Sequence, residues 1–517
     1  MPGKISFKEY QMDQPLLLPP SLEELVPENH LVRIVNKVIE NMNLTNLLKE
    51  YKGGGNSSYH PKMMLKVIIY AYTQKHYSCR EIAKALRENI HFMWLSAANK
   101  PDFRTINLFR QKLKKVIFEI FFNVVHFLEE NNLIQLKNYF LDGTKIEANA
   151  NKYSFVWKKS TEHYMKNLKK KVKTLLTQID EYDELENKKY GSKDLPEMGE
   201  DSHITADMLA ETVQKIDQAL SDDGKKKDLK KVASKIKKDI LPRLKRYEEY
   251  QQKLGKRNSF SKTDTDATFM RMKDDHMKNG QLKPAYNVQI GTENQFIVGY
   301  SLHQKTTDTS FLIPHLKHLK KHLSKKVPEN IVADAGYGSE ENYVFLGQEK
   351  YGNYVKYNLF QKEQTRKFKE DIFRVENLQY DLKKDEYLCP AGRKMPFVRT
   401  KKFVTDNGFT TERRLYECED CSHCDLREKC HTSKYNRTIQ SSPNLKRFKE
   451  QARVNLLSQR GEALRKKRGV EVESVFGQIK QNMQFRRFSL RGMENVELEW
   501  GLISLGHNFK KLSSIKG

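Results

Sequence analysis

Hydrophobic residues in the first quarter of the chain recur every three or four positions, as on one face of an α-helix. The pattern is carried by Met63, Val67 and Tyr70, then Ile82, Leu86 and Ile90, then Ile106, Phe109, Leu113, Val116 and Ile120. The third helix is expected to start at Thr105, a residue type that caps helix N-termini. We therefore predict a helical block over residues 20–135, compatible with a helix-turn-helix DNA reader and equally with a plain helical bundle.

Residues 158–262 carry narrow hydrophobic stripes, and the positions between them are largely Lys, Glu and Asp. The stripes are Leu168, Val172, Leu175, Ile179, Tyr182 and Leu185; Leu209, Val213, Ile216 and Leu220; and Leu229, Val232, Ile236 and Ile240. This pattern indicates a helical hairpin or short coiled coil. Strand patterns stop before the segment and resume after it, so we predict an inserted arm, either a solvated support or a DNA-contacting element.

Short hydrophobic runs bounded by polar residues and glycine predict β-strands on both sides of the arm. A hairpin is expected over residues 285–300, with its turn at residues 291–294. A helix over residues 309–323, a strand ending at Asp334 and a helix from about Glu340 follow. This order is typical of an α/β fold in which helices cover a mixed sheet.

Two aspartates follow hydrophobic runs and precede glycines. Asp142 follows residues 139–141, and Asp334 follows residues 331–333. Each run is interpreted as a buried strand that ends on its aspartate. A carboxylate in that position loses hydration unless a cation or hydrogen-bond donor lies beside it. Aspartate followed by glycine also caps ordinary turns, so the residues alone leave both roles open.

A third carboxylate, Glu473, lies in a predicted helix whose buried side is formed by Val472, Val475, Phe476 and Ile479. At α-helical spacing, Glu473 and Lys480 share a face to within about 20°. Glu471 lies about 200° away and is expected to face solvent. Two aspartates and this glutamate could hold two divalent cations, which stabilise both oxygens of an in-line phosphoryl displacement.

The charge of the chain points to the substrate of such chemistry. Lys and Arg number 93 and Asp and Glu 66, so the formal net charge is +27. An excess of this size indicates a polyanion-binding protein, although a lysine-rich solvated surface has the same composition. A nucleic acid is therefore the expected phosphoryl substrate.

The compartment follows from the absence of export signals. The sequence has no run of about 18 apolar residues and no signal-peptide core at its N-terminus, so we expect a cytoplasmic protein with reduced cysteines. Reduced thiolates from two places in a chain suit structural Zn²⁺. The candidates are Cys389, Cys418, Cys421, Cys424 and Cys430, with His423 or His431 as possible substitutes for a thiolate. Unliganded thiols in a small β-rich insertion are the alternative.

Several motifs together resemble insertion-sequence transposases of the DDE class. The acidic motifs are Asp-Gly-Thr at 142–144, Asp-Ala-Gly-Tyr at 334–337 and Val-Glu-Ser-Val-Phe-Gly-Gln-Ile-Lys at 472–480. Residues 59–67, 87–90, 94–96 and 101–107 resemble the helical N-terminal domain that many of these enzymes share. Ser474 stands where proline is expected in many relatives, and either residue fits a first helical turn.

The resemblance implies a ribonuclease-H-like core, two Mg²⁺ or Mn²⁺ ions held by Asp142, Asp334 and Glu473, and DNA cleavage with strand transfer. The implied partners are double-stranded DNA, as terminal inverted repeats and target, and a second copy on the DNA ends, in a nucleoid-associated protein. The resemblance also favours Cys389, Cys421, Cys424 and Cys430 as zinc ligands and leaves Cys418 spare. Candidate DNA-phosphate contacts are Lys145, Lys480, Arg486, Arg487 and Arg491, although the arginines could equally form a solvated helix end.

The predicted domains are a helical DNA-binding domain (1–135), an inserted helical arm (158–262), a cysteine-bearing β-rich insertion (365–440), and a catalytic core (136–157, 263–364 and 441–517). Two other functions fit the same features. One is a catalytically silent, sequence-specific DNA-binding protein derived from a transposase, which the presence of all three carboxylates argues against. The other is a Mg²⁺-dependent nuclease without strand transfer, which would use the same site.

Overall fold

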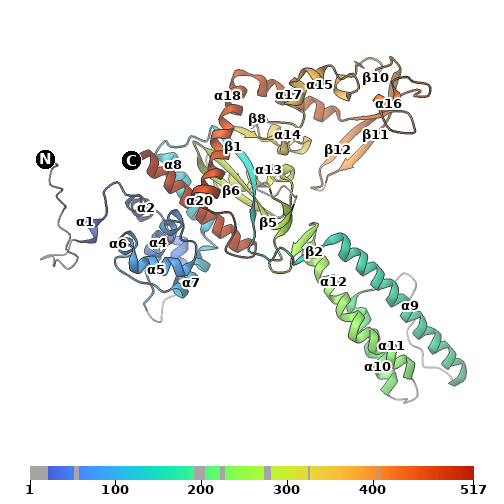
Figure 1. Cartoon of the computed structure of the whole chain (residues 1–517), viewed down its shortest axis with the longest axis horizontal. Helices are drawn as coiled ribbons and strands as arrows, with labels where there is room; N and C mark the ends of the chain where they lie inside the picture. Colours follow the sequence, from blue (N-terminus) through green and yellow to red (C-terminus); the bar gives the residue numbers. More distant parts are fainter. Residues whose placement is uncertain are drawn as a thin grey trace, which may run out of the picture.

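A six-stranded mixed β-sheet with helices around it forms the centre of the molecule (Figure 1). The computed structural model describes residues 21–51, 57–190, 204–221, 227–272, 281–323, 327–405 and 407–516. The strands of the sheet are β1 (Asn138–Glu147), β4 (Thr268–Arg271), β5 (Leu282–Glu293), β6 (Phe296–His303), β7 (Asn330–Ala333) and β8 (Gly352–Val355). The mixed α/β fold predicted from the sequence is confirmed.

The central strand β1 has neighbours of both orientations. It pairs antiparallel with β5 and parallel with β7, and the strand order is β4-β5-β1-β7-β8, with β6 antiparallel to β5. In the parallel register, Leu141 lies opposite Ala333. The next residues along each chain segment, Asp142 and Asp334, are therefore brought to the same level of the sheet.

The prediction that a strand ends on Asp142 is wrong. Strand β1 continues to Glu147 and pairs with β5 beyond the aspartate. Gly143 forms no turn, because it lies within this pairing. A Cβ atom at Gly143 would lie 2.3 Å from Nε2 of Gln289, so the glycine makes room for a side chain from the neighbouring strand.

The predicted turn at residues 291–294 is also displaced. Gly291 lies within β5, where a Cβ atom would be 1.7 Å from Cζ of Tyr139. The turn falls on Asn294 and Gln295, whose φ angles are 53° and 64°. In both places the sequence was interpreted as a turn because glycine marks turns, whereas here glycine permits close packing.

Helices lie on both faces of the sheet. A Cβ atom at Gly299 of β6 would contact Leu319 of α13 (Leu312–His322), and one at Gly501 of α20 (Met493–Lys516) would contact Tyr300. Neighbouring strand residues point to opposite faces, so α13 and α20 cover opposite sides. The helices predicted at residues 309–323 and from Glu340 correspond to α13 and α14 (Glu340–Gln348).

The N-terminal block is helical, as predicted. Its helices are α1 (Leu22–Leu25), α2 (Leu31–Glu40), α3 (Thr45–Lys49), α4 (Pro61–Thr73), α5 (Cys79–Glu88), α6 (Ile90–Leu95), α7 (Phe103–Leu113) and α8 (Ile117–Glu130). Helix α7 starts two residues before Thr105. Asp102 is its N-cap, because its side chain accepts a hydrogen bond from the Thr105 backbone N–H at 2.7 Å.

The N-terminal block does not have a hydrophobic core of its own. Helix α4 is buried on nearly all sides and packs against both α2 and the C-terminal helix α20. Buried residues of the block, the sheet and α20 form one continuous hydrophobic core. Residues 1–135 therefore do not bury their hydrophobic faces by themselves, since part of the cover of α4 comes from α20 at the other end of the chain.

The inserted arm projects from the sheet as a separate helical bundle (Figure 1). It contains α9 (Lys158–Tyr190), α10 (Ala206–Ser221), α11 (Lys227–Lys235), the π-helical turn η1 (Ile236–Ile240) and α12 (Leu241–Leu254). Two short strands, β2 (Phe155–Trp157) and β3 (Ser259–Ser261), pair at its base. In the part of the chain that the structure describes, no helix is long and apolar enough to span a bilayer.

The cysteine-bearing insertion contains a second, five-stranded sheet with the order β13-β12-β11-β10-β9. Its strands are β9 (Tyr380–Asp381), β10 (Glu386–Leu388), β11 (Lys394–Val404), β12 (Thr410–Glu417) and β13 (Thr438–Ser441). Three short helices precede them and one lies among them: η4 (Lys362–Gln364), α15 (Arg366–Lys369), η5 (Val375–Asn377) and α16 (Arg427–Cys430). Helices α17 (Pro443–Leu457) and α18 (Gln459–Arg468) then return the chain to the central sheet.

Candidate active site

Asp142 and Asp334 meet at the centre of the main sheet because β1 and β7 are parallel neighbours. Oδ1 of Asp142 accepts the backbone N–H of Gly143 at 2.8 Å, and Oδ1 of Asp334 accepts that of Gly336 at 2.9 Å. These two hydrogen bonds restrain the rotation of both carboxylates. The side chain of Asp142 is 10% exposed and that of Asp334 is 38% exposed, so the pair lies at the border between core and solvent.

The turn after Asp334 is held by side chains from neighbouring elements. It forms the 3₁₀ turn η3 (Ala335–Tyr337), which lies against a second such turn, η2 (Asp308–Ser310). Thr309 Oγ1 donates to the Gly336 carbonyl at 2.9 Å, and Asn342 Nδ2 donates to the Tyr337 carbonyl at 2.7 Å. Because these bonds anchor both ends of η3, they fix the position of the aspartate that caps it.

A long helix brings Glu473 to the two aspartates. Helix α18 continues without interruption through η6 (Gly469–Glu473), α19 (Ser474–Gly477) and η7 (Gln478–Asn482), of which η6 and η7 are π-helical. Arg468 and Glu473 are five residues apart. In an α-helix they would point about 140° apart, whereas the i→i+5 bonding of a π-helix places them one turn above each other.

Arg468 contacts all three carboxylates. Its Nη2 atom lies 2.9 Å from Oδ2 of Asp142 and 4.0 Å from Oδ2 of Asp334, and its Nη1 atom lies 3.4 Å from Oε1 of Glu473. The Arg468 side chain is only 10% exposed, and its buried Nε atom has no hydrogen-bond partner in the described part of the chain. One buried cation therefore links the three acidic residues that the sequence placed in three separate motifs.

The expectation that Glu471 faces solvent is wrong. Glu471 is 2% exposed, and its carboxylate accepts the Gln295 backbone N–H at 2.7 Å and pairs with Lys467 at 3.1 Å. It therefore stabilises the turn between β5 and β6. The expectation failed because the side of the helix opposite Glu473, where Glu471 lies, packs against β5 and the turn after it, whereas the Glu473 side is the exposed one.

The same helix changes two further expectations. Ser474 does not lie in a first turn, since the helix begins fifteen residues earlier at Gln459, and its hydroxyl donates to the Val470 carbonyl inside the helix. Lys480 lies in η7 and is partly buried. The predicted shared face of Glu473 and Lys480 assumed a regular α-helix, which the structure does not have between them.

The comparisons with known proteins agree with the motifs. The family model described as transposase DDE domain matches residues 388–513, and the model described as transposase domain (DUF772) matches residues 20–112. These two matches support an insertion-sequence DDE transposase. The resemblance stated from the sequence is thereby confirmed. Comparison with curated proteins and with solved structures gave no match.

The matched regions cover only part of the candidate site. Glu473 and Arg468 lie within the DDE-domain match, whereas Asp142 and Asp334 lie outside both matches. The two aspartates are connected to the matched region by the ion pairs of Arg468. Sequence reasoning missed Arg468, because it is the last of four consecutive basic residues, 465–468, and nothing local distinguishes it from the other three.

A lysine that the sequence reasoning also missed lies near the three carboxylates. Burial lowers the pKa of Lys356, and repulsion from Arg468 and Arg465 lowers it further, while Asp334 and Glu473 oppose the shift. These interactions place Lys356 close to the acidic cluster. It follows β8 directly, so the strand order of the sheet accounts for its position.

The basic residues predicted to contact DNA phosphates all make contacts within the chain. Lys145 donates to the Arg271 carbonyl at 3.0 Å, and Arg486 donates to the Lys480 carbonyl at 3.3 Å. Three further carbonyl contacts join the segment after the helix to the loop after β1: Arg487 to Ala148 and Ala150, both at 3.2 Å, and Arg491 to Asn149 at 2.7 Å. These arginines therefore hold the loop after β1 in place.

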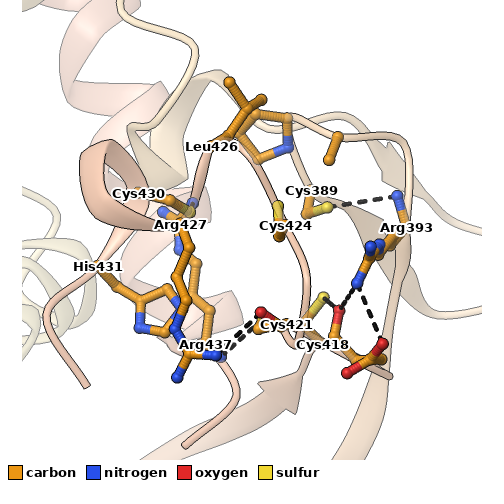
Figure 2. Close-up of a pocket in the computed structure, with 13 residues that line it drawn as sticks. Cys389, Arg393, Cys418, Cys421, Cys424, Leu426, Arg427, Cys430, His431 and Arg437 are labelled. Carbon is orange, nitrogen blue, oxygen red and sulfur yellow. Dashed lines mark hydrogen bonds and ion pairs between the residues drawn. The ribbon is translucent and has the colours of Figure 1, made fainter. Parts of the chain in front are cut away.

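Five cysteines of the insertion line one cavity together with His431 (Figure 2). Cys389 Sγ accepts the Arg393 backbone N–H and Cys421 Sγ accepts the Arg437 backbone N–H, both at 3.3 Å. Among the described residues, neither buried ring nitrogen of His431 has a hydrogen-bond partner. Burial, together with repulsion from Arg427 and Arg437, lowers the pKa of His431.

The donor chemistry of this cavity fits Zn²⁺, although the side chains do not form a closed ligand set. Burial raises the pKa of Cys418 to about 12, and its hydrogen bond with Cys421 adds to the shift. Cys430 Sγ accepts a hydrogen bond from the Arg437 guanidinium at 3.1 Å. Within the described ranges, no group of three or more His, Cys, Asp or Glu side chains is arranged to hold a metal ion.

Proposed function

We propose that this transposase binds the ends of a mobile element and catalyses metal-dependent DNA cleavage and strand transfer at Asp142, Asp334 and Glu473. The convergence of the three carboxylates on Arg468 carries the proposal. Three acidic side chains that lie 2.9 to 4.0 Å from one cationic group form a centre suited to positive charge. Residues so far apart in sequence have no local reason to meet there.

The architecture around the site supports a ribonuclease-H-like core. The strands β6, β5 and β1 are successive antiparallel neighbours, and β7 and β8 continue the sheet in parallel with β1. One aspartate lies on the central strand and the other follows the adjacent parallel strand. The glutamate comes from a helix that packs across both strands.

The oxygens of Asp142, Asp334 and Glu473 would hold the divalent cations, for which carboxylates are preferred ligands. When bound, Mg²⁺ or Mn²⁺ supplies Lewis acidity and stabilises charge on the phosphoryl oxygens. The protein supplies the placement of the ligands, through the β1–β7 register and the anchored turn η3. Lys356, beside the cluster, is positioned to bind a DNA phosphate near the reacting one.

DNA is the proposed partner because of the net charge of +27 and the match of the N-terminal helices to a transposase domain. We propose that these helices recognise the terminal inverted repeats and that two copies act together on paired ends, as the resemblance implies. Nucleoid association would follow from the affinity for DNA. Lys480, Arg486, Arg487, Arg491 and Lys145 remain candidates for phosphate contacts around the site.

The test is cleavage of linear DNA that carries the element's ends, in the presence of Mg²⁺, by Asp142→Asn and Asp334→Asn variants. We expect cleavage to fall by at least about 10²-fold, because each change removes a ligand needed in the transition state. DNA binding should change little, because phosphate contacts elsewhere supply affinity. Glu462→Gln, an exposed residue on α18, is the matched control and should cleave like the wild type.

Uncut ends, and precut ends supplied with a target plasmid, together separate the three functions. Joining of precut ends to the plasmid supports a transposase, cleavage of uncut ends without joining indicates a nuclease, and binding without either indicates a silent DNA-binding protein. If Asp142→Asn and Asp334→Asn cleave at the wild-type rate, these aspartates are not the catalytic site.

A further inference from the structure

The guanidinium of Arg468 and a divalent cation require the same oxygens. Nη2 of Arg468 lies 2.9 Å from Oδ2 of Asp142 and 4.0 Å from Oδ2 of Asp334. Oxygen ligands of Mg²⁺ lie about 2.0–2.1 Å from the ion, in a near-octahedral shell. A cation that takes these two oxygens therefore meets the guanidinium at close range, and the two positive charges repel each other.

The surroundings of Arg468 give its charge few other partners. The residue is 8% exposed, and its buried Nε atom has no hydrogen-bond partner among the residues that the structure describes. Within the same residues, the ion pairs of its other two guanidinium nitrogens lead to the three carboxylates. A buried charge is costly unless it is paired, so Arg468 and the carboxylates depend on each other.

We propose that Arg468 is a positioning residue that holds the three carboxylates together by charge and that a divalent cation must displace it to enter the site. This inference rests on the proposed function, since it takes the same carboxylates as metal ligands. Arg468 thereby sets the metal affinity. In the absence of metal, it keeps the three acidic side chains close to one another against their mutual repulsion. It also lowers the affinity of the site for the first metal ion.

The first measurement is Mn²⁺ binding by calorimetry, without DNA, to the full-length wild type, Arg468→Gln and Arg468→Lys. We expect Arg468→Gln to bind Mn²⁺ about tenfold more tightly, because one nearby positive charge is removed. Arg468→Lys keeps the charge and should bind like the wild type. Arg460→Gln removes an exposed arginine from the same helix and should also bind like the wild type. Equal or weaker Mn²⁺ binding by Arg468→Gln overturns the proposal.

The second measurement is thermal unfolding in EDTA, which does not depend on any metal site. Arg468→Gln should lower Tm in the wild-type background, because the carboxylates then lose the cation that contacts all three of them. In an Asp142→Asn background the same change should lower Tm by less than half as much, since one repelling charge has gone. An equal loss of Tm in both backgrounds overturns the proposal, and the Asp142→Asn background also keeps the test usable if the single variant fails to fold.

These outcomes separate the inference from the proposed function. If Asp142→Asn and Asp334→Asn bind Mn²⁺ as tightly as the wild type, the carboxylates are not the metal ligands and the proposed function fails. The unfolding measurement in EDTA still decides whether Arg468 holds the carboxylates together by charge.

Discussion

At the residue scale, the two glutamates of η6 have opposite environments only two positions apart. Glu473 is 64% exposed at its side chain and lies beside Arg468, whereas the side chain of Glu471 is 2% exposed and caps the β5–β6 turn. A solvent-accessible carboxylate is free to exchange its partner for a ligand, and a buried one with fixed donors is not. The structure therefore separates a candidate catalytic residue from a stabilising one.

Substitution of each glutamate should have a different effect. Glu473→Gln should lower cleavage by at least about 10²-fold with little change in stability, because it removes a proposed metal ligand from an exposed position. Glu471→Ala should instead lower the free energy of unfolding by about 1–3 kcal/mol, because the Gln295 N–H loses its buried acceptor. Cleavage rates and urea unfolding of both variants check this. If Glu471→Ala loses cleavage and Glu473→Gln does not, the catalytic role belongs to Glu471 and the assignment is wrong.

At the scale of elements, the insertion is a small sheet that contributes six buried hydrophobic residues, among them two of its cysteines. A cluster of this size supplies little stability by itself, and small domains commonly add a structural metal. The cysteines from two segments, the N–H donors to their sulfurs and the unpartnered His431 are consistent with that addition. Their role as zinc ligands stays a proposal.

If Cys389, Cys421, Cys424 and Cys430 bind Zn²⁺, elemental analysis should find about one equivalent per chain. Cys424→Ser should lower both the zinc content and Tm, because a bound metal contributes its binding free energy to folding. Cys79→Ala removes a cysteine of the N-terminal block and should leave the zinc content unchanged. Protein that is free of zinc and melts at the same temperature with or without added Zn²⁺ would exclude the site.

At the scale of the whole molecule, the two ends of the chain share one core. Helix α20 covers α4 on one side and the main sheet on the other. Gly501 and Gly506 of α20 permit this close approach, since Cβ atoms there would lie 2.5 Å from Tyr300 Oη and 3.3 Å from the Tyr72 carbonyl carbon. The N-terminal helices and the catalytic sheet are therefore expected to unfold together.

A fragment of residues 1–135 should consequently lack a cooperative unfolding transition, because it loses the cover that α20 gives to α4. Circular dichroism during urea titration of the fragment and of the full chain measures this. We expect a sharp transition only for the full chain. A fragment that unfolds as sharply as the full chain would show that the block folds alone.

Buried histidines should make the folded state sensitive to acid. Burial lowers the pKa of His315 to about 3 and that of His507 to about 4. Between pH 6.5 and these values the unfolded chain binds more protons than the folded one, so stability falls as the pH falls. Each residue should contribute a loss of about 2 kcal/mol between pH 7 and pH 5.

Urea unfolding of His315→Gln at pH 7 and pH 5 tests this expectation. The difference in unfolding free energy between the two pH values should be smaller than in the wild type by about 2 kcal/mol. His163→Gln changes an exposed residue of the arm and should show the wild-type difference. An undiminished pH dependence in His315→Gln would mean that this histidine is not held neutral.

What could be predicted from the sequence depended on local spacing. The helical block and the arm follow from hydrophobic periodicity, which reports on neighbours within a few residues. The insertion was predicted from its cysteines. The aspartates were found because hydrophobic runs lead into Asp142 and Asp334, and Glu473 because its motif resembles a known one. The turns predicted at Gly143 and Gly291 were wrong, because each glycine makes room for a side chain from a neighbouring strand.

The tertiary structure alone decided how these pieces meet. The register of β1 on β7 joins the two aspartates, and the π-helical turn brings Arg468 and Glu473 to them while burying Glu471. None of these contacts can be read from the local sequence. A run of four basic residues does not show which of them is buried, and a helical pattern does not show which glutamate is buried. The sequence determined which elements form and which acidic residues are available, and long-range packing determined which charges face each other.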